Sequence, residues 1–123
     1  LVKTSRTIST GTGLTGGGDL SANRTISLAS SHFPIGVGQT WQNVTSSRAA
    51  GTTYTNTTGR SILVSIALFT LQGEASVPIA EWKYRIGSNE FSAKNDVVFI
   101  VPPGMTYRAG NPGNYVGRWL ELR

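Results

Sequence analysis

Residues 106–119, TYRAGNPGNYVGRW, hold the side chains best suited to binding a sugar. Carbohydrate sites commonly set an aromatic face against the ring, and pockets in general combine apolar walls with a few placed polar groups. We therefore predict a binding loop around the glycine-rich turn of this stretch, formed by Tyr107, Arg108, Asn111, Asn114, Tyr115 and Arg118. The alternative is an ordinary polar hairpin loop, with Trp119 and one tyrosine in the core.

The residues that catalysis most often needs are sparse. His32 is the only histidine, no cysteine is present, and no Gly-x-Ser-x-Gly segment supplies a nucleophile elbow. The stretch GTGLTGGG lacks the Gly-Lys-Ser/Thr ending of a phosphate-binding loop, and no helical pattern follows it. Six acidic residues are available for a glycosidase pair, but nothing in their spacing brings two together. We predict no catalytic residue, no cofactor and no metal site, and a polysaccharide-cleaving activity stays open as an alternative.

The charge of the chain is basic but dispersed. The 123 residues carry a net charge of +5, and no three basic residues are consecutive. A solvated basic surface is the plain interpretation, and attraction of phosphate, lipopolysaccharide or nucleic acid is the alternative. Nucleic-acid binding needs aromatic residues interleaved with a basic stripe. Alternation in residues 81–86 places Tyr84 opposite Lys83 and Arg85, so we predict no nucleic-acid partner.

The elements that would hold the predicted binding loop are strands. From residue 32 onward, alternating segments and apolar runs are separated by turn signals, which predicts about seven strands. The longest apolar run, residues 60–69, predicts a central strand, whereas residues 72–78 are expected to form a loop. Trp41 and Trp82 lie in alternating segments and are expected in the core. The fold class is therefore all-β, with an antiparallel β-sandwich over residues 32–123.

Residues 1–31 have a different composition. The tetrapeptide RTIS occurs at 6–9 and again at 24–27, which suggests a repeating hairpin, and a glycine-rich stretch separates the copies. Two short strands with one apolar face are marginal in water. We therefore expect the spaced apolar residues to need partners from other chains: Ile8, Leu14, Leu20, Ile26 and Leu28. The glycines would permit positive φ and close approach among the backbones of those chains.

The stretch from Gly11 to Ile26 closely resembles a motif that recurs in bacteriophage tail fibres and related tailocin fibres. The usual form is Gly-x-Gly-Leu-x-Gly-Gly-Gly-Asp-Leu-Ser-x-x-Arg-Thr-Ile, and the matching positions are Gly11, Gly13, Leu14, Gly16, Gly17, Gly18, Asp19, Leu20, Ser21, Arg24, Thr25 and Ile26. Residues 36–66 are similar to the start of a C-terminal fibre domain, with GQTW, then Arg-x-x-Gly-Thr-x-Tyr-x-Asn, then a hydrophobic strand. The segment VPPGMTYRA, at 101–109, fits a late strand and turn of the same domain type. The resemblance covers nearly the whole chain.

This resemblance implies the receptor-binding tip of a fibre. The tip would be an intertwined homotrimer, in which a glycine-rich shaft segment, residues 1–31, precedes a β-sandwich knob, residues 32–123. It would belong to the virion, join the rest of the tail fibre and attach to the host cell surface, where the usual receptor is a lipopolysaccharide sugar or an outer-membrane protein. The start at Leu1, inside a strand pattern, is then expected to be the cut end of a longer chain.

Two alternatives stay open beside that expectation. The chain would instead be a structural trimerisation module if another part of the fibre does the binding. An axial metal ion would need one His32 from each of three chains, because the sequence has no second histidine beside it.

Overall fold

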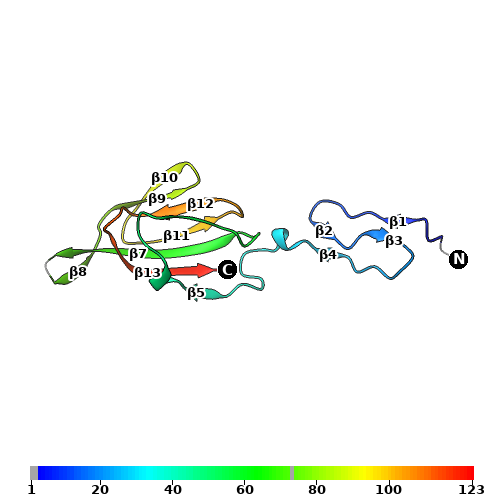
Figure 1. Ribbon diagram of the computed structural model, residues 1–123, viewed down its shortest axis with the longest axis horizontal. Helices are drawn as coiled ribbons and strands as arrows, with labels where there is room; N and C mark the ends of the chain where they lie inside the picture. Colours follow the sequence, from blue (N-terminus) through cyan, green and yellow to red (C-terminus); the bar gives the residue numbers. More distant parts are fainter. Residues whose placement is uncertain (1–2, 73) are drawn as a thin grey trace. The chain divides into compact units, whose positions relative to one another are not determined.

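The computed structural model describes residues 3–72 and 74–123. The chain divides into two compact units, Leu1–Pro34 and Ile35–Arg123, so the division falls at 34/35 where the sequence suggested 31/32. Strands and two short 3-10 helices make up the regular structure of the described residues (Figure 1). All of the strand pairs are antiparallel, which confirms the prediction of an all-β protein with antiparallel sheets. No helix in these ranges is long and apolar enough to cross a membrane.

The first unit contains four strands of two residues each. They are β1 (Thr7–Ile8), β2 (Leu14–Thr15), β3 (Gly18–Asp19) and β4 (Ser27–Leu28). Strand β1 pairs with β3, and β2 pairs with β4, so the two pairings interleave along the chain (Figure 1). The repeating hairpin suggested by the RTIS copies is therefore wrong, because each copy contributes to a different two-stranded sheet. The 3-10 helix η1 (Ser30–His32) follows β4.

Gly16 lies where two parts of the first unit come into close contact. Its φ is +96°, and a Cβ atom at this position would lie 1.9 Å from the carbonyl oxygen of Thr25. Residues with a side chain rarely adopt this φ, and the approach leaves no room for one. The close approach occurs within one chain, whereas the sequence-based expectation placed it between chains.

The loop after β3 is closed by Asp19 and Arg24. Arg24 Nη2 donates to Asp19 Oδ1 at 2.8 Å, and Arg24 Nε donates to the Asp19 carbonyl oxygen at 2.6 Å. The hydroxyl and the backbone N–H of Ser21 also donate to Asp19 Oδ1. The hydrogen bonds from the Ser21 hydroxyl and N–H, followed by the one from Arg24, lower the pKa of Asp19 below its ordinary value. The Asp-Leu-Ser-x-x-Arg part of the motif therefore closes this loop with side-chain hydrogen bonds and an ion pair.

None of the described residues of the first unit, 3–34, is buried. Four of its large apolar side chains are between 38% and 43% exposed: Ile8, Leu14, Ile26 and Leu28. Backbone hydrogen bonds and the Asp19–Arg24 ion pair hold its conformation, and residues 3–34 form no hydrophobic core among themselves.

The second unit contains two sheets (Figure 1). The four-stranded sheet has the order β10 (Asn89–Ala93), β9 (Trp82–Ile86), β12 (Thr106–Ala109), β6 (Thr53–Thr55). The five-stranded sheet has the order β11 (Asp96–Val101), β7 (Ile62–Gln72), β13 (Tyr115–Leu122), β5 (Trp41–Asn43), and β8 (Ala75–Pro78) also pairs with β7. The 3-10 helix η2 (Thr45–Ser47) follows β5.

One hydrophobic core joins the two sheets. Strand β7 contributes Ile62, Val64, Ile66 and Leu68, and Trp119 of β13 is fully buried beside them. From the four-stranded sheet come Trp82, Ala93, Tyr107 and Ala109. Burying one large aliphatic side chain contributes roughly 1.5–3 kcal/mol, so this cluster is the main source of stability in the unit. The prediction of a central strand over residues 60–69 is confirmed, since β7 lies between β11 and β13.

Two expectations about the second unit are wrong. Residues 75–78 form strand β8 rather than part of a loop, because they extend the long strand β7 into a hairpin. Trp41 is 50% exposed, whereas Trp82 is buried as predicted. Trp41 lies on the edge strand β5 and points away from the core. The next residue, Gln42, is the one paired with buried Glu121, so it is on the inward face of the strand.

Candidate functional site

The turn between β12 and β13, residues 110–114, borders two hollows on the second unit. Asn114 closes this turn, because its Oδ1 accepts a hydrogen bond from the N–H of Asn111 at 2.8 Å. The N–H of Asn114 donates in return to the carbonyl oxygen of Asn111 at 3.1 Å. Gly110 anchors the start of the turn to β9 by donating to the Lys83 carbonyl oxygen at 2.8 Å. These hydrogen bonds hold the turn in one conformation at the edge of both hollows.

The larger hollow, which we call the tyrosine hollow, has a volume of about 440 Å³. It is lined by Thr45, Ser46, Arg48, Ala49, Ala50, Gly113, Asn114, Tyr115 and Val116. Tyr115 is the largest side chain of this lining and is 58% exposed. The hollow is open to solvent, and its lining combines small apolar walls with a few polar groups. A sugar ring stacked on Tyr115 fits this chemistry.

Arg48 is the charged residue of the tyrosine hollow, and a buried carboxylate fixes its position. Arg48 Nε donates to Glu121 Oε1 at 2.9 Å, and Arg48 Nη2 donates to Glu121 Oε2 at 3.1 Å. The Cζ atom of Arg48 also lies 4.4 Å from the centre of the Tyr54 ring. The guanidinium is therefore held by a bidentate ion pair and by an aromatic face, which restricts its motion beside the hollow.

Glu121 is fully buried and accepts several further hydrogen bonds. Tyr107 donates at 2.7 Å, Trp119 Nε1 at 3.1 Å and Arg123 Nη1 at 2.7 Å. Burial alone would raise the pKa of the Glu121 carboxyl, but the hydrogen bonds from Arg48 and Tyr107 and the charges of both arginines outweigh it, so the pKa is lowered. Burial and the hydrogen bond to Glu121 raise the pKa of Tyr107 to about 12. Glu121 is therefore ionised at neutral pH and Tyr107 is neutral.

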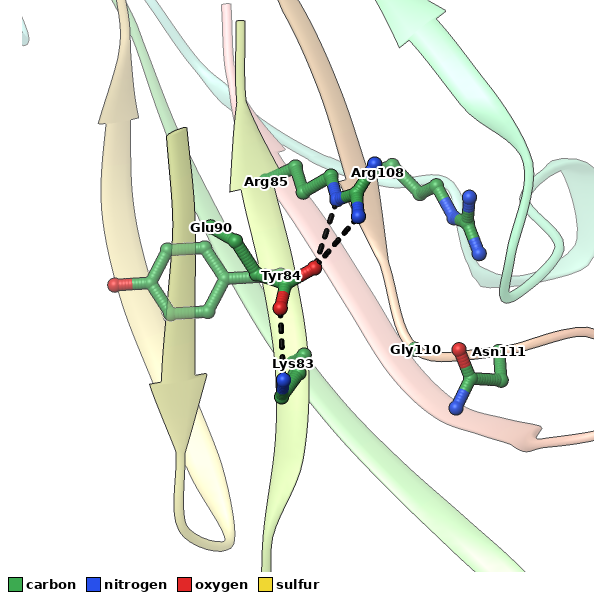
Figure 2. A pocket seen from close by; sticks show the side chains of 7 residues that line it. All are labelled: Lys83, Tyr84, Arg85, Glu90, Arg108, Gly110 and Asn111. Atoms are coloured by element: carbon green, nitrogen blue, oxygen red, sulfur yellow. Dashed lines mark hydrogen bonds and ion pairs between the residues drawn. The ribbon is translucent and has the colours of Figure 1, made fainter. Parts of the chain in front are cut away.

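The smaller hollow, which we call the arginine hollow, has a volume of about 60 Å³ (Figure 2). It is lined by Lys83, Tyr84, Arg85, Glu90, Arg108, Gly110 and Asn111. Glu90 Oε1 accepts from Lys83 Nζ at 2.8 Å, and Glu90 Oε2 accepts from Arg85 Nε at 2.9 Å. The hydrogen bonds from Lys83 and Arg85 lower the pKa of Glu90, and the bond to Glu90 raises the pKa of Lys83. Figure 2 shows Arg108 and Asn111 on the other side of the hollow from Glu90 and Lys83.

The six predicted binding residues do not form one site. Arg108 and Asn111 line the arginine hollow, while Asn114 and Tyr115 line the tyrosine hollow. Arg118 lines neither, because it forms an ion pair with Asp96 at 2.6 Å on the outer face of the five-stranded sheet.

The prediction that Tyr107 belongs to the binding loop is wrong. Its side chain is 2% exposed, and it packs in the core with its hydroxyl on Glu121. The physical reason is the register of β12, which turns Tyr107 inward opposite Tyr54 and turns its neighbour Arg108 outward opposite Thr53. Tyr107 is therefore the tyrosine, and Trp119 the tryptophan, that the alternative interpretation assigned to the core.

Sequence reasoning missed two groups of lining residues. The segment 45–50, which contains η2 and Arg48, forms one wall of the tyrosine hollow, although it is about 60 residues from the turn in sequence. Lys83, Arg85 and Glu90 come from the hairpin of β9 and β10. The alternation of residues 81–86 indicated that Lys83 and Arg85 share a face, but only the strand order brings Arg108 beside them.

His32 lies in η1, with its Nδ1 3.1 Å from the hydroxyl oxygen of Ser31. Among residues 3–72 and 74–123, no three His, Cys, Asp or Glu side chains gather closely enough to hold a metal ion. Comparison with protein-family models, with curated proteins and with solved structures finds no match to this chain.

Proposed function

We propose that this chain is the C-terminal tip of a bacteriophage or tailocin tail fibre. In this proposal the second unit is a β-sandwich knob that attaches the virion to the bacterial surface, by binding a lipopolysaccharide sugar or an outer-membrane protein. The observation that carries the proposal is that the fibre-like motif, residues 11–26, lies in a unit with no buried side chain among its described residues. Such a segment needs a partner to be stable, and in a fibre two further copies supply it.

Exposed apolar surface in each unit supports a homotrimer. In the first unit, the side chains of Ile8, Leu14, Ile26 and Leu28 are all more than a third exposed. In the second unit, the outer face of the five-stranded sheet carries an apolar row that crosses four strands in register: Ile100, Leu63, Leu122 and Trp41. Contiguous exposed apolar surface marks an interaction site. We assign both surfaces to contacts between three copies of this chain.

The trimer is tested by placing a charge in the apolar row. The variant Ile100→Lys should lose the trimer, because a lysine in an apolar interface leaves an unpaired charge out of water. The matched control is Thr55→Lys, which puts the same charge on the outward face of the four-stranded sheet. Native mass spectrometry and sedimentation velocity report the oligomer. A wild-type chain that stays monomeric at micromolar concentration would refute the trimer.

The tyrosine hollow is the surface to which we assign receptor sugar. It offers an exposed aromatic ring from Tyr115 and a guanidinium, that of Arg48, held in place by Glu121. A site that is ordered before binding avoids part of the entropy cost of fixing side chains. These features favour a binding tip over a purely structural trimerisation module.

Adsorption to cells tests the binding function. A fluorescent fusion of the whole chain is incubated with strains that carry defined lipopolysaccharide truncations. We expect adsorption to disappear at one truncation step and Tyr115→Ala to weaken it by about tenfold, the effect of losing an aromatic anchor. The control Val37→Ala alters an exposed apolar residue that lines neither hollow, and should adsorb normally. Absence of adsorption to any strain would favour the structural module, and release of reducing sugar would favour a polysaccharide-cleaving tip.

A further inference from the structure

The arginine hollow carries more positive charge than its own contacts neutralise. Lys83, Arg85 and Arg108 line it, and Glu90 is the single carboxylate in the lining. Both Glu90 oxygens are engaged by Lys83 and Arg85. The Arg108 guanidinium makes no hydrogen bond or ion pair with any side chain in the described parts of the chain. The lining therefore has two positive charges in excess, and from outside it Glu81 also acts on Lys83.

Strand register places two of these charges directly opposite each other. Arg108 of β12 is the cross-strand partner of Arg85 of β9, and Arg85 is in turn opposite Glu90 of β10. Like charges in this position destabilise an antiparallel pair. Sheet stability by itself would favour a neutral or acidic residue at position 108. A residue that lowers the stability of its own strand pair in this way is typical of a functional position.

Several donors belong to side chains that line this one small hollow. Arg85 uses Nε and Nη2 on Glu90, which leaves its Nη1 for another acceptor. The amide of Asn111 lies on the same side as Arg108 in Figure 2. The volume of about 60 Å³ is about a seventh of that of the tyrosine hollow, which suits a compact polar group.

We propose that the arginine hollow binds a phosphate monoester group. Arg108 and Nη1 of Arg85 donate to the phosphate oxygens, and the Asn111 amide adds a further donor. Two positive charges in excess match a phosphate monoester, which carries about −1.5 to −2 at neutral pH. The planar guanidinium donors fit phosphate oxygens better than lysine does. Assigning the phosphate to a bacterial surface glycan rests on the proposed function, but the anion site itself does not.

The test is a titration of the full chain with inorganic phosphate, followed by NMR of the arginine Nε–Hε groups. We expect a saturable shift of Arg108 and Arg85, and affinity about tenfold or more weaker in Arg108→Gln, the usual loss for a charge-assisted hydrogen bond. The matched control is Arg118→Gln, which removes the same charge from the other sheet and should change the affinity by less than about twofold. Acetate, with a single charge, should bind more weakly than phosphate.

Equal weakening in the two variants, or shifts that do not saturate, would overturn the anion site, because both indicate general attraction by the basic surface. If Arg108→Gln fails to fold, Asn111→Ala serves instead, with a few-fold loss of phosphate affinity expected. Cell adsorption of the same proteins separates this inference from the proposed function. Phosphate binding without adsorption supports the anion site and counts against a receptor-binding tip, whereas adsorption without phosphate binding rejects the anion site alone.

Discussion

The two units of this chain are stabilised by different kinds of contact. The first unit has strands of two residues, and its described part buries no side chain. The second unit contains the 11-residue strand β7, which aligns four buried aliphatic side chains on one face. A core needs several apolar residues in register, and two-residue strands cannot supply them. Strand length therefore separates a unit with its own core from one that we propose depends on other copies.

Both units contain arginine–carboxylate pairs, and Arg24–Asp19 in the first differs in burial from Arg48–Glu121 in the second. In the first unit, Arg24 and Asp19 are 28% and 51% exposed, so water competes with the pair. In the second unit, Glu121 is 0% exposed and Arg48 is 16% exposed. A buried pair that loses one partner leaves an uncompensated charge. The pair in the first unit therefore closes one loop, whereas the pair in the second unit contributes to the stability of the whole fold of that unit.

The largest effect is expected from Glu121→Gln. The substitution keeps the shape but removes the charge that Arg48 and Arg123 face, which should lower the free energy of unfolding by about 3–5 kcal/mol. Urea denaturation at one chain concentration measures the loss. The control is Glu90→Gln, which breaks solvent-exposed ion pairs and should cost far less. Equal losses in the two variants would remove the distinction between buried and exposed pairs.

A smaller effect is expected in the first unit from Gly16→Ala. The new Cβ would meet the Thr25 carbonyl oxygen, and alanine is strained at φ +96°, at a cost of about 1–3 kcal/mol. Since we propose that this unit forms only in the trimer, the cost applies to all three chains, and trimer dissociation should begin at a chain concentration at least about tenfold higher. Gly11→Ala is the control, because nothing lies within 4 Å of its Cβ and its φ is not positive. Analytical ultracentrifugation measures the concentration at which the trimer dissociates. An unchanged value would mean that the trimer does not require glycine at position 16.

The smallest effect is an acid dependence carried by Glu121. Its pKa is lower in the folded chain than the ordinary value of 4.5, so the folded state holds the proton less well than the unfolded state. The resulting stabilisation is present above about pH 4.5 and is lost as the pH falls through the folded pKa. Urea midpoints between pH 6 and pH 3 should therefore decline less in Glu121→Gln than in the wild type. A parallel decline would assign the acid sensitivity to other carboxylates, such as Asp19.

Much of the local structure could be predicted from the sequence. Strand β11 ends at Val101, where Pro102 removes a donor, and β13 (Tyr115–Leu122) lies within the region from residue 32 onward where strands were predicted. The burial of the residues predicted to bind was only partly predictable. Tyr115 lies exposed at a hollow, but Tyr107 lies in the core, since alternation defines two faces without saying which one is buried.

A β-bulge in β13 changes which face its side chains occupy. Strict alternation would place Tyr115 on the face of Trp119, yet Tyr115 is exposed and Trp119 is fully buried. The register shifts between Val116 and Arg118, so Gly117 is the extra residue, and the ring of Phe69 occupies the space that a side chain there would need. One inserted residue reverses the alternation, and the local sequence carries no sign of it beyond the glycine itself.

The all-β class, most strand positions and the motif that led us to propose a fibre depend on neighbours within a few residues, so they can be read from the sequence. Which distant residues meet depends on how the strands assemble into sheets. Arg108 lies opposite Arg85 through strand order, and Arg48 reaches Glu121 across 73 positions. Trp41 is exposed because β5 is an edge strand, and its pairing with β13 decides which of its side chains face the core. Charge and burial depend on these long-range pairings, and alternation along the chain does not specify them.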